Sequence, residues 1–198
     1  KTVISYKEYA DGDECTGSIQ MMDLTKKSLP NTVSVGGRDF LVYTDFRLWM
    51  RFEMESGRMQ PDDLIDVSYL FQGEVPQYCD IRELYAFSRP QDELPRQMKH
   101  TSETVLDYGI DADYIYAAFM SQYGTDLMDI KELHWHKFLA LFKGLKDDEM
   151  ICKIMSYRCY EHSEEKKDIY EELKQMWRIE YTSREEQEES DRFSNIFY

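Results

Sequence analysis

The chain has 198 residues, of which 42% are hydrophobic and 14% aromatic, and a formal net charge of −15. This is enough apolar material for one domain with a proper core, and the acidic balance argues against binding nucleic acid through its phosphates, which requires clustered Lys and Arg. The sequence contains no run of about 18 apolar residues and no signal-peptide pattern, so it predicts a soluble, intracellular protein with no membrane span.

Residues 1–28 begin the chain without a sustained hydrophobic period. We interpret them as a flexible arm, or as an extension upstream of a natural translation start at Met21-Met22. The residues themselves do not decide between these two interpretations.

Residues 32–43 carry the first regular pattern, a β-hairpin. Two β-branched or aromatic runs flank Gly36-Gly37, which supplies the positive φ that a tight turn requires. A two-stranded ribbon is marginally stable alone, so we expect it to pack on the helices that follow.

Two helices are predicted after the hairpin. The first covers residues 46–56, with Asp45 as its N-cap. The second is short and covers residues 61–71, because Pro61 suits a first helical turn and acidic side chains follow it. Its inward-facing residues are expected to be Leu64, Val67 and Phe71.

A third short amphipathic helix is predicted over residues 77–88, and Pro90 closes it. The residues from Pro90 to Gly109 contain two prolines and no apolar stripe. We therefore expect a long loop that returns the chain to the central elements.

Two helix-length segments, residues 111–124 and 131–145, are predicted to form a helical hairpin at the centre of the fold. The second segment carries an apolar stripe at helical spacing, which must be buried. This stripe consists of Trp135, Phe138, Leu139 and Phe142. The matching surface of the first segment consists of Ile115, Ala118, Phe119 and Met120. Gly124 is where the first helix is expected to stop.

Two more helices are expected toward the C-terminus. The first covers residues 147–158, and Arg158 continues its inward face, so this side chain should be paired or reach solvent. Its other inward residues are Ile151, Ile154 and Met155. The second covers residues 164–180, with Ser163 as its cap. Its apolar face consists of Ile169, Leu173, Met176 and Trp177.

Residues 183–198 form an acidic run that ends in aromatic side chains. Such runs are usually disordered, and aromatics at the end of one can serve as a docking peptide. Trp49 and Trp135 are assigned to the core. The candidate partner-binding residues are Trp177, Phe193, Ile196, Phe197 and Tyr198.

The cysteines Cys15, Cys79, Cys152 and Cys159 form no C-x-x-C pair. Cys152 and Cys159 lie seven residues apart in one helical segment, a separation of about 10 Å, which is too far for a disulfide. We therefore expect free thiols in a reducing compartment.

One arrangement suggests catalysis, the pair His134 and His136 near Asp126 and Asp129. Histidines two apart on a helix project about 200° apart, so they cannot both bind one metal. We expect His134 to be structural at the helix start and His136 to be solvated. A metal-dependent hydrolase using these four residues is the least favoured alternative.

Other catalytic patterns are missing from the sequence, which has no Gly-rich phosphate loop and no nucleophile motif. Paired acids stand at predicted helix starts, where the helix dipole explains them. An acidic DNA mimic fits the charge, but these acids do not form phosphate-like rows. The sequence therefore predicts no enzyme, with no catalytic residues, metal ligands or cofactor.

These elements predict a mainly α fold, in which residues 29–182 form a domain of about six helices with a small N-terminal β-hairpin.

Several motifs occur in a specific order between Leu29 and Arg158. The most specific are Thr44-Asp45-Phe46-Arg47 with Trp49, the YGTDL connector (residues 123–127), His134-Trp135 with Phe138, and the terminal Arg158. In these motifs the chain resembles the phage gene-product-fifteen family, found in the tail modules of temperate phages of Gram-positive bacteria.

The resemblance implies a non-enzymatic tail assembly chaperone, because the family is known by its gene position beside the tape-measure gene. Proteins from that position look like chaperones that coat the tape-measure helix until tail-tube subunits replace them. The implied partner is the tape-measure protein, with the tail-tube protein, a companion chaperone and a homo-oligomer as further candidates. The implied location is the cytoplasm of the bacterial host, outside the mature virion.

Two alternatives stay open beside this interpretation. One is a structural virion component, such as a tail-completion or connector subunit. The other concerns the chain's start: family members usually begin near Met21, which favours the upstream extension.

Overall fold

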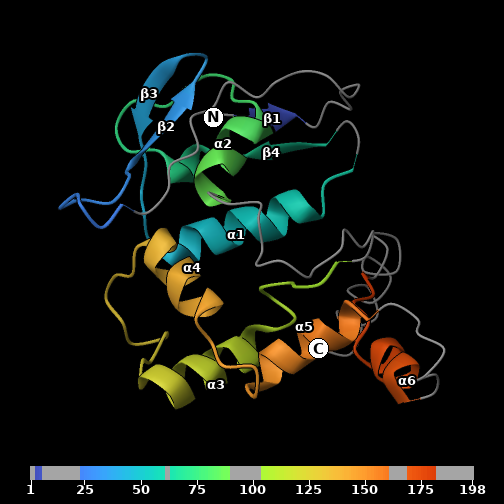
Figure 1. Cartoon of the computed structure of the whole chain (residues 1–198). Coiled ribbons are helices and arrows are strands. Elements are labelled where there is room, and N and C mark those ends of the chain that lie inside the picture. The colour runs from blue at the N-terminus through green and yellow to red at the C-terminus, as the bar shows by residue number, and fades with distance from the viewer. Residues whose placement is uncertain (1–2, 6–22, 61–62, 90–103, 161–168, 182–198) are drawn as a thin grey trace, which may run out of the picture.

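The computed structural model describes residues 3–5, 23–60, 63–89, 104–160 and 169–181 (Figure 1). Within these ranges there are six α-helices, one short 3-10 helix and two antiparallel sheets of two strands each. This confirms the predicted mainly α fold with a small N-terminal hairpin. No helix in the same ranges is long and apolar enough to cross a membrane.

The predicted hairpin is formed by β2 (Thr32–Val35) and β3 (Arg38–Leu41). Gly36 and Gly37 have φ values of 58° and 81°, the left-handed conformation that a primed two-residue turn requires at both positions. The Gly36 N–H donates to a carboxylate oxygen of Glu83 at 2.7 Å. The turn is therefore tied to the helix that contains Glu83.

The helix predicted over residues 61–71 is wrong. β4 (Leu64–Asp66) pairs antiparallel with β1 (Val3–Ser5), and the 3-10 helix η1 (Ser68–Leu70) follows. The Asp66 side chain accepts the N–H of Ser68 at 3.0 Å, a local bond that competes with helix formation. Leu64, expected to face inward, is exposed, whereas Val67 and Phe71 are buried.

Residues 1–28, predicted to be an arm or an upstream extension, contribute strand β1 to this sheet. The Ile4 side chain is fully buried in the core. Part of the segment therefore packs on the domain.

The helix α1 (Phe46–Gly57) occurs where it was predicted. The helix α2 (Ile81–Ser88) ends as predicted but begins four residues later than the predicted residue 77, because Asp80 is its N-cap. Asp45 caps α1 by accepting the N–H of Arg47, and Asp80 with Glu83 forms a capping box on α2. Trp49 on α1 is fully buried. Its ring lies 4.4 Å from the ring of Phe87 on α2, measured between centroids, so the two helices share one core.

The lower half of Figure 1 contains α3 (Ala112–Tyr123), α4 (Trp135–Lys143) and α5 (Met150–Arg158). The predicted stop of α3 is confirmed, since Gly124 caps it with φ 61°. α4 packs mainly on α1 and α3 mainly on α5. The two members of the predicted helical hairpin meet through the stacked rings of Phe119 and Phe138, 5.1 Å apart.

The core is centred on Phe138 of α4. Its ring stacks on Phe46 of α1 at 5.3 Å and on Trp135 at 5.6 Å, besides Phe119. Trp135 is fully buried, as predicted. Met120, expected to join this surface, is exposed instead, because it is rotated about 100° from its buried neighbour Phe119.

Candidate partner-binding site

The helix α6 (Ile169–Met176) lies at the edge of the molecule beside α5 (Figure 1). Its docked side is formed by Tyr170, Lys174 and the following Trp177. The Tyr170 ring stacks on Tyr160 at 5.2 Å, and Lys174 donates to the Tyr160 carbonyl at 3.2 Å. The Trp177 ring meets Tyr114 edge-on at 5.6 Å. Because these positions are i, i+4 and i+7, they share one side of the helix.

Of the four residues predicted to form the apolar face of α6, Trp177 is on this docked side and the other three lie on a different side. Ile169 is 71% exposed and Met176 is 72% exposed, and only Leu173 is partly buried. At about 100° per residue, the side formed by Ile169, Leu173 and Met176, here called the α6 stripe, is centred roughly 90° around the helix from the docked side. Ile169 and Met176, predicted to lie on the apolar face of this helix, are therefore not buried by the rest of the described chain.

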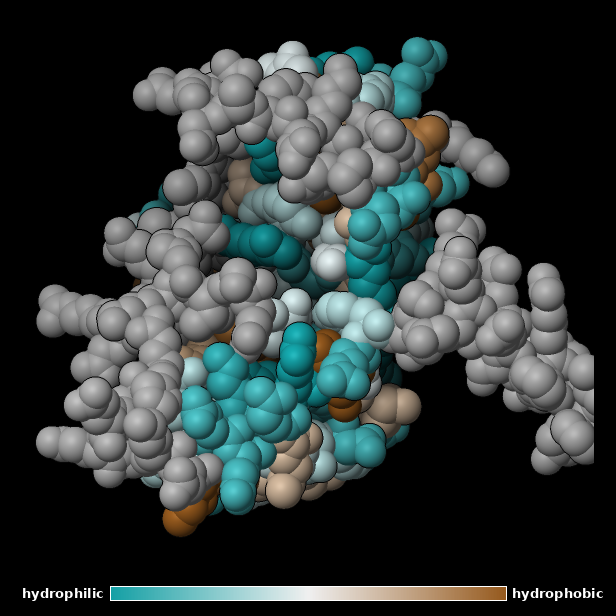
Figure 2. Space-filling view, turned by 90° about the vertical axis from the view of Figure 1, so that its right-hand side faces the viewer, coloured by the Kyte–Doolittle hydropathy of each residue, from teal (hydrophilic) through white to brown (hydrophobic). Residues whose placement is uncertain are grey.

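The surroundings of α6 are largely hydrophilic. Figure 2 views this side of the molecule, where hydrophilic residues of the lower half surround separate hydrophobic ones. No residue of α6 is buried. The helix therefore contacts the rest of the domain along one side only, and within the described part of the chain the α6 stripe is exposed to solvent.

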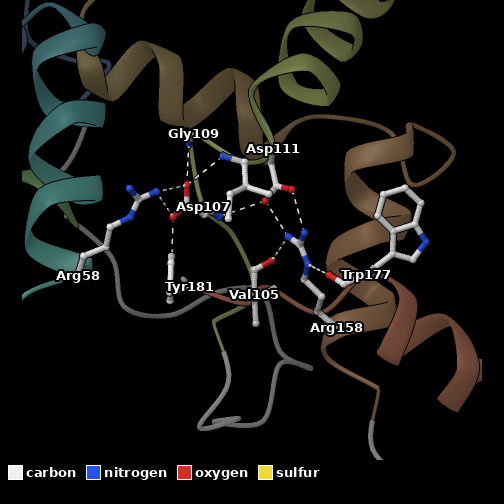
Figure 3. Close-up of polar contacts among 9 residues, drawn as sticks. Arg58, Val105, Asp107, Gly109, Asp111, Arg158, Trp177 and Tyr181 are labelled. Carbon is white, nitrogen blue, oxygen red and sulfur yellow. Dashed lines mark hydrogen bonds and ion pairs between the residues drawn. The ribbon is translucent and has the colours of Figure 1, made fainter. Parts of the chain in front are cut away.

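A buried ion pair holds the end of α6 on the body (Figure 3). Arg158 at the end of α5 donates to both oxygens of Asp111, at 2.7 and 2.9 Å, and both side chains are buried. The same guanidinium donates to the Trp177 carbonyl at 2.6 Å and to the Val105 carbonyl at 3.0 Å. The pairing expected for Arg158 is therefore confirmed, and it joins α5, the start of α3 and the end of α6.

Asp107 forms a second anchor, four residues before Asp111 (Figure 3). Its carboxylate accepts hydrogen bonds from Arg58, Gly109, Ile110 and the Tyr181 hydroxyl. Burial raises the pKa of Asp107, but the bonds from Ile110, Arg58 and Gly109 outweigh it and hold the pKa below its usual value. The Asp107 N–H also donates to Asp111 at 3.0 Å, so the two anchors are linked.

The polar anchors were not predicted beyond the pairing of Arg158. Asp107 lies in a segment that was predicted to be a loop, and its partner Tyr181 follows the last helix. A short D-Y-G-I-D run with two carboxylates is the one local signal, since Asp side chains readily accept neighbouring N–H groups. The partners Arg58 and Tyr181 come from distant parts of the chain.

Of the five predicted partner-binding residues, one lies within the described part of the chain and four lie outside it. Trp177 is half-buried on the docked side of α6, where its ring contacts Tyr114 and its carbonyl contacts Arg158. The remaining candidates lie outside the described residues. They are Phe193, Ile196, Phe197 and Tyr198. The predicted cap Ser163 and most of the predicted loop after Pro90 also lie outside them.

His134 stands at the start of α4, where it was predicted. Its Nδ1 accepts the N–H of His136 at 3.0 Å, and its Nε2 donates to the Pro30 carbonyl at 2.8 Å. His134 is thus the N-cap of α4 and ties this helix to the chain before the hairpin.

The prediction that His136 is solvated is wrong, since only 3% of the residue is exposed. Its Nε2 donates to the Phe87 carbonyl at 2.9 Å, and the neighbouring Trp135 indole donates to the Ser88 carbonyl at 2.8 Å. Two side chains of α4 therefore satisfy carbonyls at the end of α2. Burial lowers the pKa of His136 to about 4, so the ring is neutral near pH 7.

The two histidines and the nearby acids do not form a metal site in the structure. Asp126 accepts the N–H groups of Met128 and Asp129, which is a turn function. Among the described residues, no group of three or more His, Cys, Asp or Glu could hold a metal ion.

The described cysteines Cys79, Cys152 and Cys159 are free thiols. Burial raises the pKa of each one, and neighbouring carboxylates add to the effect at Cys79 and Cys152. A raised pKa keeps these groups protonated near pH 7, so none of the three is an activated nucleophile.

Comparison with known proteins identifies a family. A family model described as "Bacteriophage Gp15 protein" matches residues 50–179, from within α1 to just beyond α6. The matched range includes the α6 stripe and the anchor residues Asp107, Asp111 and Arg158, and it ends before Tyr181. Searches of curated proteins and of solved structures found no match.

Proposed function

We propose that this chain, which belongs to the bacteriophage Gp15 protein family, is a tail assembly chaperone that binds the tape-measure protein without an enzymatic step. It would act in the host cytoplasm, before tail-tube subunits replace it on the tape measure. The observation that carries the proposal is the α6 stripe, in which Ile169 and Met176 are more than seven-tenths exposed on a helix that is otherwise anchored.

The physical requirements of such a chaperone support the proposal. A long amphipathic helix must be covered along its apolar face until assembly, which calls for apolar contact surface on the chaperone. The complex must also stay dissolved, and a net charge of −15 provides repulsion between complexes.

The small size of the α6 stripe agrees with reversible binding. Three side chains on about two helical turns give a weak single contact, and weak contacts repeated along a long client add up through multivalency. Such a coat can be displaced one copy at a time by tail-tube subunits.

Coexpression tests the proposal. The tape-measure protein of the same phage should be insoluble when expressed alone, and should remain in the soluble fraction and copurify when this chain is present. A tape measure that stays insoluble, with nothing copurifying, contradicts the proposal.

Mass spectrometry of purified virions gives a second test. A chaperone should be missing from the mature particle. Its presence at a fixed copy number would support a structural virion component, such as a tail-completion or connector subunit, instead.

A further inference from the structure

We infer that the α6 stripe binds an amphipathic helix of another protein whose apolar face is bordered by Lys or Arg side chains. The inference rests on the proposed function and deepens it by assigning the contact site and the chemistry of the partner segment.

The stripe is available because other groups hold α6 in place. Tyr170, Lys174 and Trp177 make the docked side, and the Trp177 carbonyl is held by Arg158 at 2.6 Å. None of these contacts uses Ile169 or Met176. A partner can therefore cover the stripe without displacing an anchor.

The spacing of the stripe fits a helix. Ile169, Leu173 and Met176 lie at i, i+4 and i+7, so they form a straight row over about two turns, roughly 10 Å. Rows of this kind pack into the groove beside the matching row of a second helix. Met176 adds an unbranched side chain that adapts to an irregular client surface.

The acidic side chains beside the α6 stripe favour a partner helix that carries basic residues. Glu171 and Glu172 are exposed in the first turn of α6, and Glu172 borders Ile169 and Met176 on the side away from the body. The basic residue Lys174 is on the docked side, where it donates to the Tyr160 carbonyl. A helix with Lys or Arg beside its apolar face would therefore meet an opposite charge.

Two other occupants are disfavoured by the same charges. A second copy of α6 would place Glu172 against its own counterpart. The chain's last residues, 183–198, contain five acidic and two basic side chains, so they would also bring like charge to the stripe.

Binding of two designed peptides tests the inference. Both are fluorescein-labelled 21-residue helices with the same Leu face, one bordered by Lys and the other by Glu, and each is titrated with the full chain by fluorescence anisotropy. The Lys-bordered peptide should bind at least tenfold more tightly. Equal binding of the two peptides overturns the inference.

A double variant, Ile169→Asp with Met176→Asp, separates the stripe from general attraction to an acidic protein. It should weaken binding of the Lys-bordered peptide at least tenfold, although the added negative charge would strengthen any nonspecific attraction. The matched control is Met128→Asp, because Met128 is 83% exposed and lies far from α6 in the sequence. Unchanged binding by the double variant, or an equal loss in the control, overturns the inference.

Sedimentation of the unlabelled chain tests the second-copy alternative. Self-association that the double variant abolishes would assign the stripe to a dimer contact and overturn the inference. A wild-type chain and a double variant with the same sedimentation behaviour support it.

The tape-measure coexpression distinguishes this inference from the proposed function. If the double variant still keeps the tape measure soluble, the chaperone role stands and the α6 site is wrong. If the wild-type chain binds the Lys-bordered peptide through the stripe but does not bind the tape measure, the chaperone role is wrong and the site's chemistry stands.

Discussion

The helices α4 and α6 carry the same kind of apolar pattern, but it is buried on α4 and exposed on α6. Trp135, Leu139 and Phe142 lie at i, i+4 and i+7 on α4, as Ile169, Leu173 and Met176 do on α6. Trp135 is fully buried, and Leu139 and Phe142 pack against the core. Ile169 and Met176 are among the most exposed large hydrophobic residues described.

The difference comes from what surrounds each helix and what fixes its rotation. α4 lies against α1, its Phe138 stacks on Phe46 and Phe119, and its Trp135 and His136 donate to carbonyls of α2. The rotation of α6 is fixed by polar and aromatic contacts on another side. Periodicity identifies the face that would gain from burial, but a neighbour must exist to bury it.

The largest effect on stability is expected from a substitution at the centre of the α4 stripe. Phe138→Ala should lower the free energy of unfolding by about 4 kcal/mol, because it deletes a fully buried ring stacked on four others. Met176→Ala should change it by less than about 0.5 kcal/mol. Urea unfolding of both variants checks this, and similar losses would refute the contrast between the two helices.

Breaking the anchor of α6 is expected to rank next. Arg158→Met should lower the free energy of unfolding by about 3 kcal/mol, because it leaves the buried Asp111 carboxylate without its cation. The control is Arg38→Met, since Arg38 and Glu74 form an exposed pair worth less than about 1 kcal/mol.

Limited proteolysis shows whether this loss includes release of α6. Cleavage near α6 should accelerate in Arg158→Met and stay unchanged in Arg38→Met. Equal cleavage in the two variants would mean that the ion pair does not hold α6.

The buried histidine of α4 should make stability depend on pH in a defined window. The folded pKa of His136 is about 4 and its usual value is 6.5, so the unfolded chain binds the proton first and stability falls as pH drops through this range. The loss between pH 7 and 4.5 should be about 2 kcal/mol.

His136→Gln is the matching variant, because its amide can still donate to the Phe87 carbonyl but does not titrate. Urea unfolding at pH 7 and pH 4.5 should give a smaller difference for this variant than for the wild type. If the difference between the two pH values is the same in His136→Gln as in the wild type, His136 is not its cause.

Asp107 contributes to the pH dependence of stability at lower pH. Its folded pKa is below 3.8, so its contribution to stability is lost only as the pH falls through that lower value.

The smallest expected effect concerns the second anchor. Tyr181→Phe should lower the free energy of unfolding by about 1 kcal/mol, because it removes one hydrogen bond to Asp107 and keeps the ring beside Arg58. Hydrogen exchange should show faster opening of α6 with α4 unaffected. Equal acceleration in both helices would argue that α6 unfolds only with the whole domain.

The elements that could be predicted are those that local chemistry specifies. Asp45, Gly124 and Gly36-Gly37 mark a cap, a helix stop and a turn through side chains or backbone conformations within a few residues. The strand β4 could not be found this way, because its partner is β1, far away in the sequence. The burial of His136 was missed for the same reason, since its partner is the Phe87 carbonyl of α2.

Sequence patterns located the six described α-helices and the hairpin, but they also predicted a helix over residues 61–71 that does not form. They identified Arg158 as a side chain that needed a partner. These properties depend on spacing, capping and charge, which are local. The tertiary structure alone decided that Arg158 meets Asp111 and Trp177, and that α6 turns Ile169 and Met176 outward. The rotation of an amphipathic helix depends on which distant groups bind it, and here buried polar anchors and aromatic contacts outweigh its apolar stripe.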